Sequence, residues 1–206
     1  DAPNAVANAI DSLLPEAAGT PLAADVLLAE NGPVEVTLPC GTHLVSRVVA
    51  RHDITLRIQG RTRLIVAGDV SSQSGATFKV VLENEYAQLD LLVQGALTTG
   101  GNLELGSWDR PGGVRMFSAA TGTLDLSGSV MIGGLLFAPQ AELVVSAPTR
   151  IYGALFVERI SASALLRVRQ DLRLSADPGC APGRCSMDGA ACGSRVCNLD
   201  RCQPCT

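Results

Sequence analysis

Large apolar residues recur along this chain every 19 or 20 residues, and this repeat limits the possible folds more than any other feature. Each of them lies in a short apolar or alternating run that is typical of a β-strand. The seven positions are Leu38, Ile58, Phe78, Leu97, Phe117, Phe137 and Phe156. Two further registers join Leu103, Leu124, Leu143 and Ile160, and Ile132, Ile151 and Val168. A fixed period of this size predicts a repeat architecture.

Three short strands per repeat predict an all-β fold, a parallel β-helix (β-solenoid) of about seven coils, with coils ~4.8 Å apart. The seven repeated residues then form a ladder inside the coil. Composition agrees, because 47% of the residues are hydrophobic but only 3% are aromatic, and a narrow interior favours aliphatic side chains. An antiparallel sandwich is the alternative, but the Asn-Gly hairpin signal at Asn31 precedes the repeats.

Glycine-containing dipeptides between the apolar runs are expected to form the corners of the coil, where the glycines would supply positive φ angles. The expected corners are Gly68-Asp69, Gly100-Gly101, Gly112-Gly113, Ser127-Gly128 and Gly133-Gly134.

The first 30 residues form a separate segment in this interpretation. An apolar stripe at helical spacing follows Asn4, a favourable N-cap, and Pro15 is expected to end the helix at Leu14. The stripe consists of Val6, Ile10, Leu13 and Leu14. It either caps the N-terminal end of its own rod or docks onto a neighbouring subunit. A second apolar piece, residues 21–28, fits a helix or a strand.

Six of the seven cysteines lie in the last 27 residues, in a Gly- and Pro-rich segment that is too poor in apolar residues to bury a core. Disulfides are the favoured interpretation, because a second C-x-x-C pair for zinc is missing. The six are Cys180, Cys185, Cys192, Cys197, Cys202 and Cys205. The remaining Cys40 pairs with its own tail, pairs with the tail of the next subunit, or stays free.

The expected organisation is therefore a cap or docking segment (1–30), a β-helix (31–175) and a disulfide-stapled tail (176–206). A disulfide-rich tail, together with a first residue other than Met, predicts a secreted protein whose signal peptide has been removed.

Part of the repeat region resembles a known family. Within residues 122–172, the matching elements are Leu126-Ser127-Gly128, the run Phe137–Ala141, and Ile151-Tyr152-Gly153-Ala154. They are similar to the C-terminal coils of a β-helix domain in secreted, pilus-assembly-associated (PilX-like) bacterial surface proteins. This resemblance implies a structural or surface role. The coils are also loosely similar to polymer-forming bactofilins and to ice-binding β-helices, and the tail resembles Cys-rich modules of myxobacterial surface proteins.

No residue pattern in the chain points to catalysis, a metal or a cofactor. His43 and His52 have no acidic or cysteine cluster spaced to join them, and P-loop, GxGxxG, HExxH and GxSxG motifs are missing. Asp90, Glu104 and Asp125 alternate with apolar strand residues and are expected to point outward. A net charge of -4 argues against nucleic acid as a partner, and no apolar stretch of ~18 residues is present to span a membrane.

These observations favour an extracellular structural protein that assembles with itself, head to tail, into a bacterial surface filament or matrix, with disulfides between subunits as one option. The alternative is a monomeric adhesin or surface-glycan-binding module in which Trp108 contacts the glycan. The structural interpretation of Trp108 is that it covers a corner of the coil. The third option is an ice-binding protein, for which the expected ranks of Thr are missing, or a carbohydrate-active β-helix protein.

Overall fold

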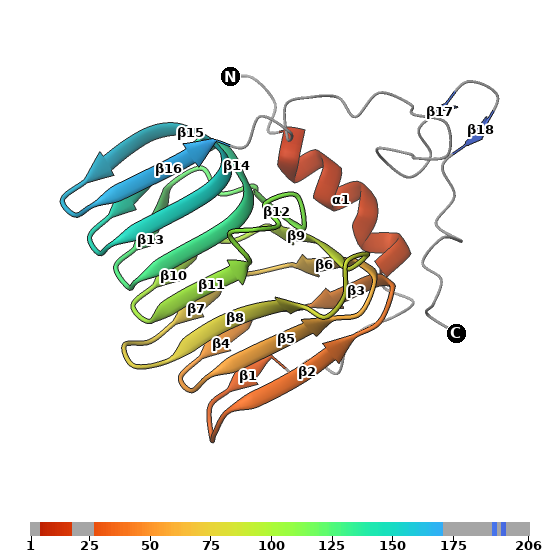
Figure 1. The fold of residues 1–206 in the computed structure, drawn as a ribbon, viewed down its shortest axis with the longest axis horizontal. Helices are drawn as coiled ribbons and strands as arrows, with labels where there is room; N and C mark the ends of the chain where they lie inside the picture. Colours follow the sequence, from red (N-terminus) through yellow and green to blue (C-terminus); the bar gives the residue numbers. More distant parts are fainter. Residues whose placement is uncertain (1–4, 18–26, 171–190, 193–194, 197–206) are drawn as a thin grey trace.

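Parallel pairing of strands from successive coils organises the computed structural model, which describes residues 5–17, 27–170, 191–192 and 195–196. The chain winds into a β-solenoid of about seven turns, with three strands in each turn (Figure 1). Its coils climb from β1 and β2 at one end to β15 and β16 at the other. The predicted parallel β-helix is therefore confirmed, and a short helix, α1 (Ala5–Ala17), precedes it.

Copies of the three strands stack into three flat faces. Face 1 consists of β1 (Leu28–Ala29), β4 (Val48–Ala50), β7 (Val70–Ser72), β10 (Leu97–Thr99) and β13 (Thr123–Leu126). Face 2 consists of β2 (Val34–Leu38), β5 (Ile54–Ile58), β8 (Thr77–Leu82) and β11 (Asn102–Gly106), and ends in β16 (Leu166–Gln170). Face 3 consists of β3 (Gly41–Val45), β6 (Arg61–Val66), β9 (Gln88–Val93) and β12 (Val114–Ser118). Two long strands, β14 (Val130–Val145) and β15 (Thr149–Ala162), bend around the solenoid and contribute to all three faces.

One continuous column of aliphatic side chains runs through the interior from the first coil to the last. Its seven members are stacked in register on face 2: Val36, Leu56, Val80, Leu105, Ile132, Ile151 and Val168. The five members between the two ends are buried, because coils lie above and below them. Each coil thus supplies one aliphatic rung, and close packing of these side chains excludes water from the narrow interior.

The predicted core ladder is only partly correct. Leu38 does stack on Ile58, and Phe117, Phe137 and Phe156 do stack on one another. However, Phe78 pairs with Ile54 and Leu103 on face 2, and Leu97 belongs to face 1. A fixed period fails because the coils differ in length. The stacked pair Thr149 and Leu166 is 17 residues apart in the sequence, whereas Val70 and Leu97 are 27 apart.

Phe117, Phe137 and Phe156 of that ladder also point outward, whereas Phe78 points into the core. Met116 and Ser118 on either side of Phe117 are buried, so the alternation of the strand turns the Phe117 ring to the outside of face 3. Phe156 is 55% exposed. The two further registers agree better with the structure. Leu124, Leu143 and Ile160 stack on one another, as do Ile132, Ile151 and Val168. In the first of them, Leu103 pairs with Val130 instead.

The corner glycines serve close packing of coils rather than positive φ. Among the described residues, positive φ angles occur at Gly41, Gly75, Gly106 and Gly153, none of which was expected. At the predicted corners the next coil lies too close for a side chain. A Cβ on Gly128 would come within 1.7 Å of the Gly101 carbonyl oxygen, and one on Gly101 within 2.2 Å of the Ala76 oxygen.

Helix α1 fits the predicted cap, but it lies along face 3 and not across the end of the rod. Val6 and Ile10 are buried against Ile65 and Leu92 of that face. The Gln94 side chain also donates a hydrogen bond to Asp11 over 3.0 Å. The helix extends to Ala17, beyond Leu14, because a proline in the last turn removes few helical hydrogen bonds. Residues 18–26, which include most of the second apolar piece, lie outside the described residues.

Most of the cysteine-rich tail also lies outside the described residues, apart from the paired strands β17 (Ala191–Cys192) and β18 (Arg195–Val196). Cys40 follows β2 and is disulfide-bonded. The boundaries at residues 30 and 175 stay predictions.

We predict that Gly128→Ala lowers the free energy of unfolding by about 2 kcal/mol or more, because the new methyl group must displace the backbone of the neighbouring coil. Chemical denaturation of both proteins measures the difference. Gly122→Ala is the matched control, since no atom lies within 4 Å of its Cβ position, and it should change stability little. Equal effects of the two substitutions would show that coil spacing does not require Gly128.

Candidate functional site

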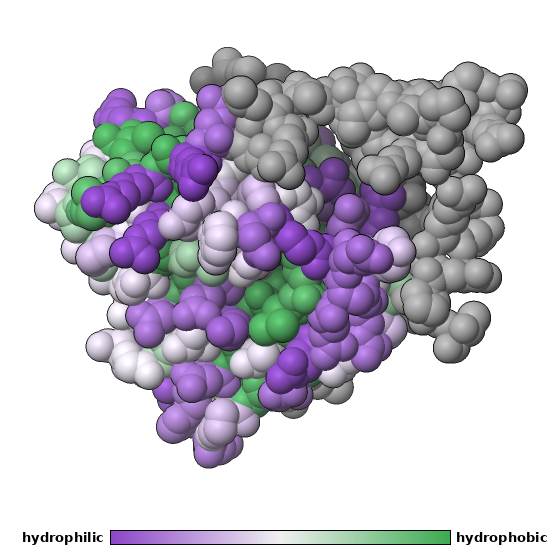
Figure 2. All heavy atoms as spheres, viewed as in Figure 1, coloured by the Kyte–Doolittle hydropathy of each residue, from purple (hydrophilic) through white to green (hydrophobic). Residues whose placement is uncertain are grey.

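Two exposed regions of the solenoid and one covered face carry the features that bear on function. The first exposed region is the open end of the last coil. Val168 stacks on Ile151, which is completely buried, yet Val168 itself is 45% exposed because no described coil follows it. Ile160 and Leu165 are exposed in the same coil. Hydrophobic side chains gather over β15 and β16 in the space-filling view (Figure 2).

Both ends of the solenoid also have strand edges without a partner in the described residues. At the first coil, β1, β2 and β3 pair only with β4, β5 and β6. At the last coil, β16 and the second half of β15 pair only with the coil before them. Backbone N–H and C=O groups along such edges are available to another strand.

The second exposed region is a pair of loops on adjacent coils. Trp108, in the loop between β11 and β12, is 65% exposed, so it does not cover a coil corner. Tyr86, in the loop between β8 and β9, is exposed to a similar extent. The guanidinium of Arg110 joins the two loops, because it donates hydrogen bonds to the carbonyl oxygens of Asn84 over 2.6 Å and Glu85 over 2.8 Å.

Local interactions set the charge of these loops. The Ser107 hydroxyl donates a hydrogen bond to Asp109 and holds the pKa of that carboxyl below its usual range. The neighbouring Glu85 carboxylate accepts a hydrogen bond from Tyr86 and raises the pKa of its phenol. At neutral pH the loops therefore present an ionised Asp109 and a neutral Tyr86 hydroxyl.

The third feature is an outward-facing row of apolar side chains on face 3, which we call the outer ladder. Its members are Leu44, Ile65, Leu92, Phe117, Phe137 and Phe156, stacked in register across successive coils. Ring centroids are 6.2 Å apart between Phe117 and Phe137 and 5.8 Å apart between Phe137 and Phe156. Helix α1 packs on the ladder as far as Phe137 and leaves Phe156 exposed.

The predicted partner contacts are therefore distributed differently. Val6 and Ile10 pack on the chain's own outer ladder and are not available to a neighbour, and Leu13 is half-buried in the same contact. The side chain of Leu14 is not among the described ones. Of the four members of this set whose side chains are described, only Trp108 is largely exposed. The sequence did not distinguish the outer ladder from the core. Both sets of alternate positions in these strands contain apolar residues, and the sequence does not show which set faces inward.

The histidines lie apart from each other. His43 lies in β3 and its ring nitrogen contacts the Pro39 carbonyl oxygen at 3.1 Å, whereas His52 is exposed in the loop before β5. Asp53 next to His52 accepts a hydrogen bond from the Thr77 backbone over 2.8 Å and so joins two coils. No group of three or more potential metal ligands occurs within the described part of the chain.

The outward acidic residues fit their prediction. Glu104 pairs with Lys79 over 2.8 Å on the outside of face 2, and Asp90 pairs with Arg115 on the outside of face 3. Asp125, on face 1, accepts a hydrogen bond from Ser127.

These features define a β-solenoid with one helix-covered face, two ends whose strand edges have no partner among the described residues, and an aromatic loop pair. The chain belongs to the family described as Domain of unknown function (DUF7305), whose model matches residues 1–176. No curated protein and no solved structure matches the chain. Among the helices that the structure describes, none is long and apolar enough to cross a membrane.

We predict that Ile10→Ala loosens α1 from face 3 at a cost of about 2–5 kcal/mol, because a fully buried side chain leaves a cavity in a small contact. Hydrogen exchange of the α1 backbone amides should speed up, while exchange within β5 and β8 stays slow. Asn8→Ala, at an exposed position of the same helix, should leave the exchange rates nearly unchanged. Unchanged exchange in Ile10→Ala would mean that this contact does not hold the helix.

Proposed function

We propose that this protein is an extracellular structural subunit that stacks head to tail into a bacterial surface filament or matrix. The observation that carries the proposal is the interior column of face 2, which is aliphatic at every rung and open at the last one. Val36 is its first rung and Val168 its last. A second copy placed on the last coil would set Val36 over Val168 and continue the column.

The strand edges favour the same contact. The two strand edges of the last coil, on β15 and β16, would meet β1 and β2 of the next subunit, in the parallel arrangement that already joins neighbouring coils within the chain. An end-to-end contact between two different surfaces does not close on itself and therefore produces a filament. Cys40 is disulfide-bonded, and the odd number of cysteines leaves at least one further thiol that a disulfide between subunits could use.

An extracellular location is part of the proposal and rests on the sequence. Six cysteines in a short tail with little apolar content suit an oxidising compartment. The resemblance to β-helix domains of pilus-associated surface proteins and to bactofilins points to the same kind of role. The proposal assigns no catalysis and no cofactor to the chain.

The stacking proposal predicts that Val168→Asp prevents assembly, because the joint would then bury an unpaired carboxylate. The full-length protein should form oligomers that grow with concentration in light scattering and rods in electron micrographs, and Val168→Asp should stay monomeric. Thr98→Asp, at an exposed position on the side of the solenoid, should assemble normally. A wild-type protein that stays monomeric at every concentration would contradict the proposal, as would a Val168→Asp protein that assembles.

A monomeric adhesin or glycan-binding module is the second candidate, and the aromatic loop pair favours it. Exposed aromatic rings can stack on the apolar faces of sugar rings, and Arg110 holds the Trp108 loop against the Tyr86 loop.

This second function predicts that immobilised surface glycans retain the protein and that Trp108→Ala weakens retention tenfold or more, since loss of a Trp at the centre of a contact costs about 2 kcal/mol or more. A glycan array measures both proteins side by side. Thr98→Ala should bind like the wild type, because it changes an exposed position on face 1. Retention that does not depend on Trp108 would rule out the loop pair as the binding site.

A further inference from the structure

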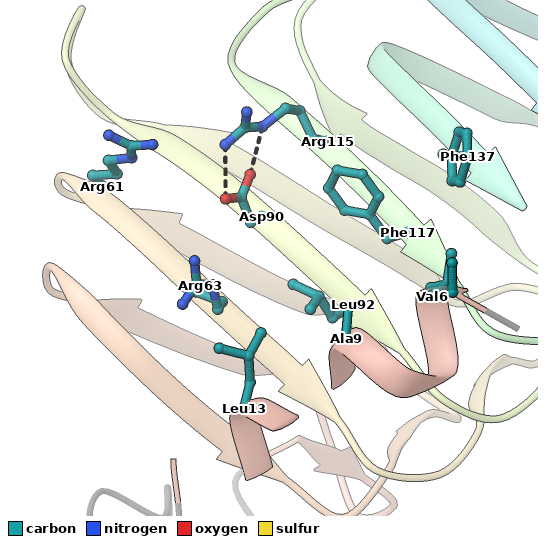
Figure 3. A pocket seen from close by; sticks show the side chains of 11 residues that line it. Val6, Ala9, Leu13, Arg61, Arg63, Asp90, Leu92, Arg115, Phe117 and Phe137 are labelled. Carbon is teal, nitrogen blue, oxygen red and sulfur yellow. Dashed lines mark hydrogen bonds and ion pairs between the residues drawn. The ribbon is translucent and has the colours of Figure 1, made fainter. Parts of the chain in front are cut away.

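A groove of about 390 Å³ lies between helix α1 and face 3, and neither function proposed above uses it. Its floor comes from β6, β9 and β12 and its wall from one side of the helix (Figure 3). This volume lies within the range of ligand-binding pockets, ~300–1,000 Å³.

One end of the groove is basic. Arg63, Asp90 and Arg115 occupy consecutive rungs of one outward column, and Arg61 lies nearby on the same strand as Arg63. Arg115 binds both carboxylate oxygens of Asp90, with Nε to Oδ1 at 2.6 Å and Nη2 to Oδ2 at 2.7 Å. Asp90 is the only carboxylate among the described residues that line the groove, and Arg115 already binds both of its oxygens.

Arg63 is the arginine of this column whose charge is not paired within the described residues. No carboxylate in the described part of the chain forms an ion pair with it. In the strand register, Arg63 lies beside Asp90 of the adjacent coil, and the carboxylate of Asp90 already forms an ion pair with Arg115. A half-buried guanidinium has five donors in a planar fork, which match the two oxygens of a carboxylate.

The other end of the groove is apolar. Phe117 and Phe137 of the outer ladder line it together with Leu92, and Val6 of α1 lies close to Phe137, whereas Leu13 lies nearer Arg63 (Figure 3). The two phenylalanine rings are tilted at 57° to each other. Burial of a hydrocarbon chain against these side chains is favourable by ~25 cal/mol per Å² of apolar surface.

We propose that the groove binds a free amphipathic carboxylic acid of the fatty-acid type. Its carboxylate is held by Arg63, beside the Arg115–Asp90 pair, and its hydrocarbon chain lies along Leu92, Phe117 and Phe137 beneath α1. The basic and apolar ends are both required by this assignment, because a purely polar anion would leave the phenylalanines unused and a neutral lipid would leave Arg63 unpaired.

Isothermal titration of the full-length protein with dodecanoate, below its micellar concentration, tests the proposal. Dodecanoate should bind with one-to-one stoichiometry, and dodecanol and dodecyltrimethylammonium should bind at least tenfold more weakly. Arg63→Gln should weaken dodecanoate binding tenfold or more, the loss expected for a charged hydrogen-bonded contact. Phe137→Ala should weaken it as well, and Arg150→Gln, at an exposed position on face 2, should not.

Equal affinity for the three twelve-carbon probes would overturn the proposal, as would dodecanoate binding that survives Arg63→Gln unchanged. Circular dichroism must show that Arg63→Gln is folded, and the exposed Arg150→Gln protein calibrates any general loss of charge. Cosedimentation with phosphatidylglycerol vesicles separates a membrane lipid from a free acid. If Arg63 is needed for cosedimentation but free dodecanoate does not bind, the groove recognises a membrane and the assignment is wrong.

Discussion

Backbone hydrogen bonding between parallel strands of successive coils, in one fixed register, is the constraint on which the rest of this structure depends. Because parallel pairing is kept on all three faces, each paired strand residue of a coil lies beside its counterpart in the next coil. An aliphatic side chain at one inward position therefore becomes a continuous column such as the one from Val36 to Val168. The same spacing leaves no room for a Cβ at corners such as Gly128.

The register acts equally on the outside of the solenoid. Arg63, Asp90 and Arg115 are far apart in the sequence, yet pairing of β6, β9 and β12 brings them into one column. The outer ladder from Leu44 to Phe156 arises in the same way and gives α1 a surface to pack on. A basic row and an apolar row thus run side by side on face 3, and the groove forms where the helix covers both.

How much of this could be predicted depends on whether a feature repeats. The parallel β-helix and the stacks of Leu124 on Leu143 and of Ile132 on Ile151 were predictable because the later coils have similar lengths. The earlier coils contain insertions such as the loops of Tyr86 and Trp108, which shift the period and misplaced Phe78 and Leu97. No sequence signal revealed the groove, because its guanidinium groups come from two separate strands.

The sequence by itself determined the architecture. Short apolar runs at intervals near 20 residues, with few aromatics and many glycines, suit a narrow coil of aliphatic side chains and little else. Only the tertiary structure decided which apolar residues face inward. Phe117 and Phe137 fit the period as well as any core residue, but strand alternation gives the interior to Met116 and Leu136 and turns the rings outward. Helix α1 could cover them only because pairing between coils had first aligned them into one surface.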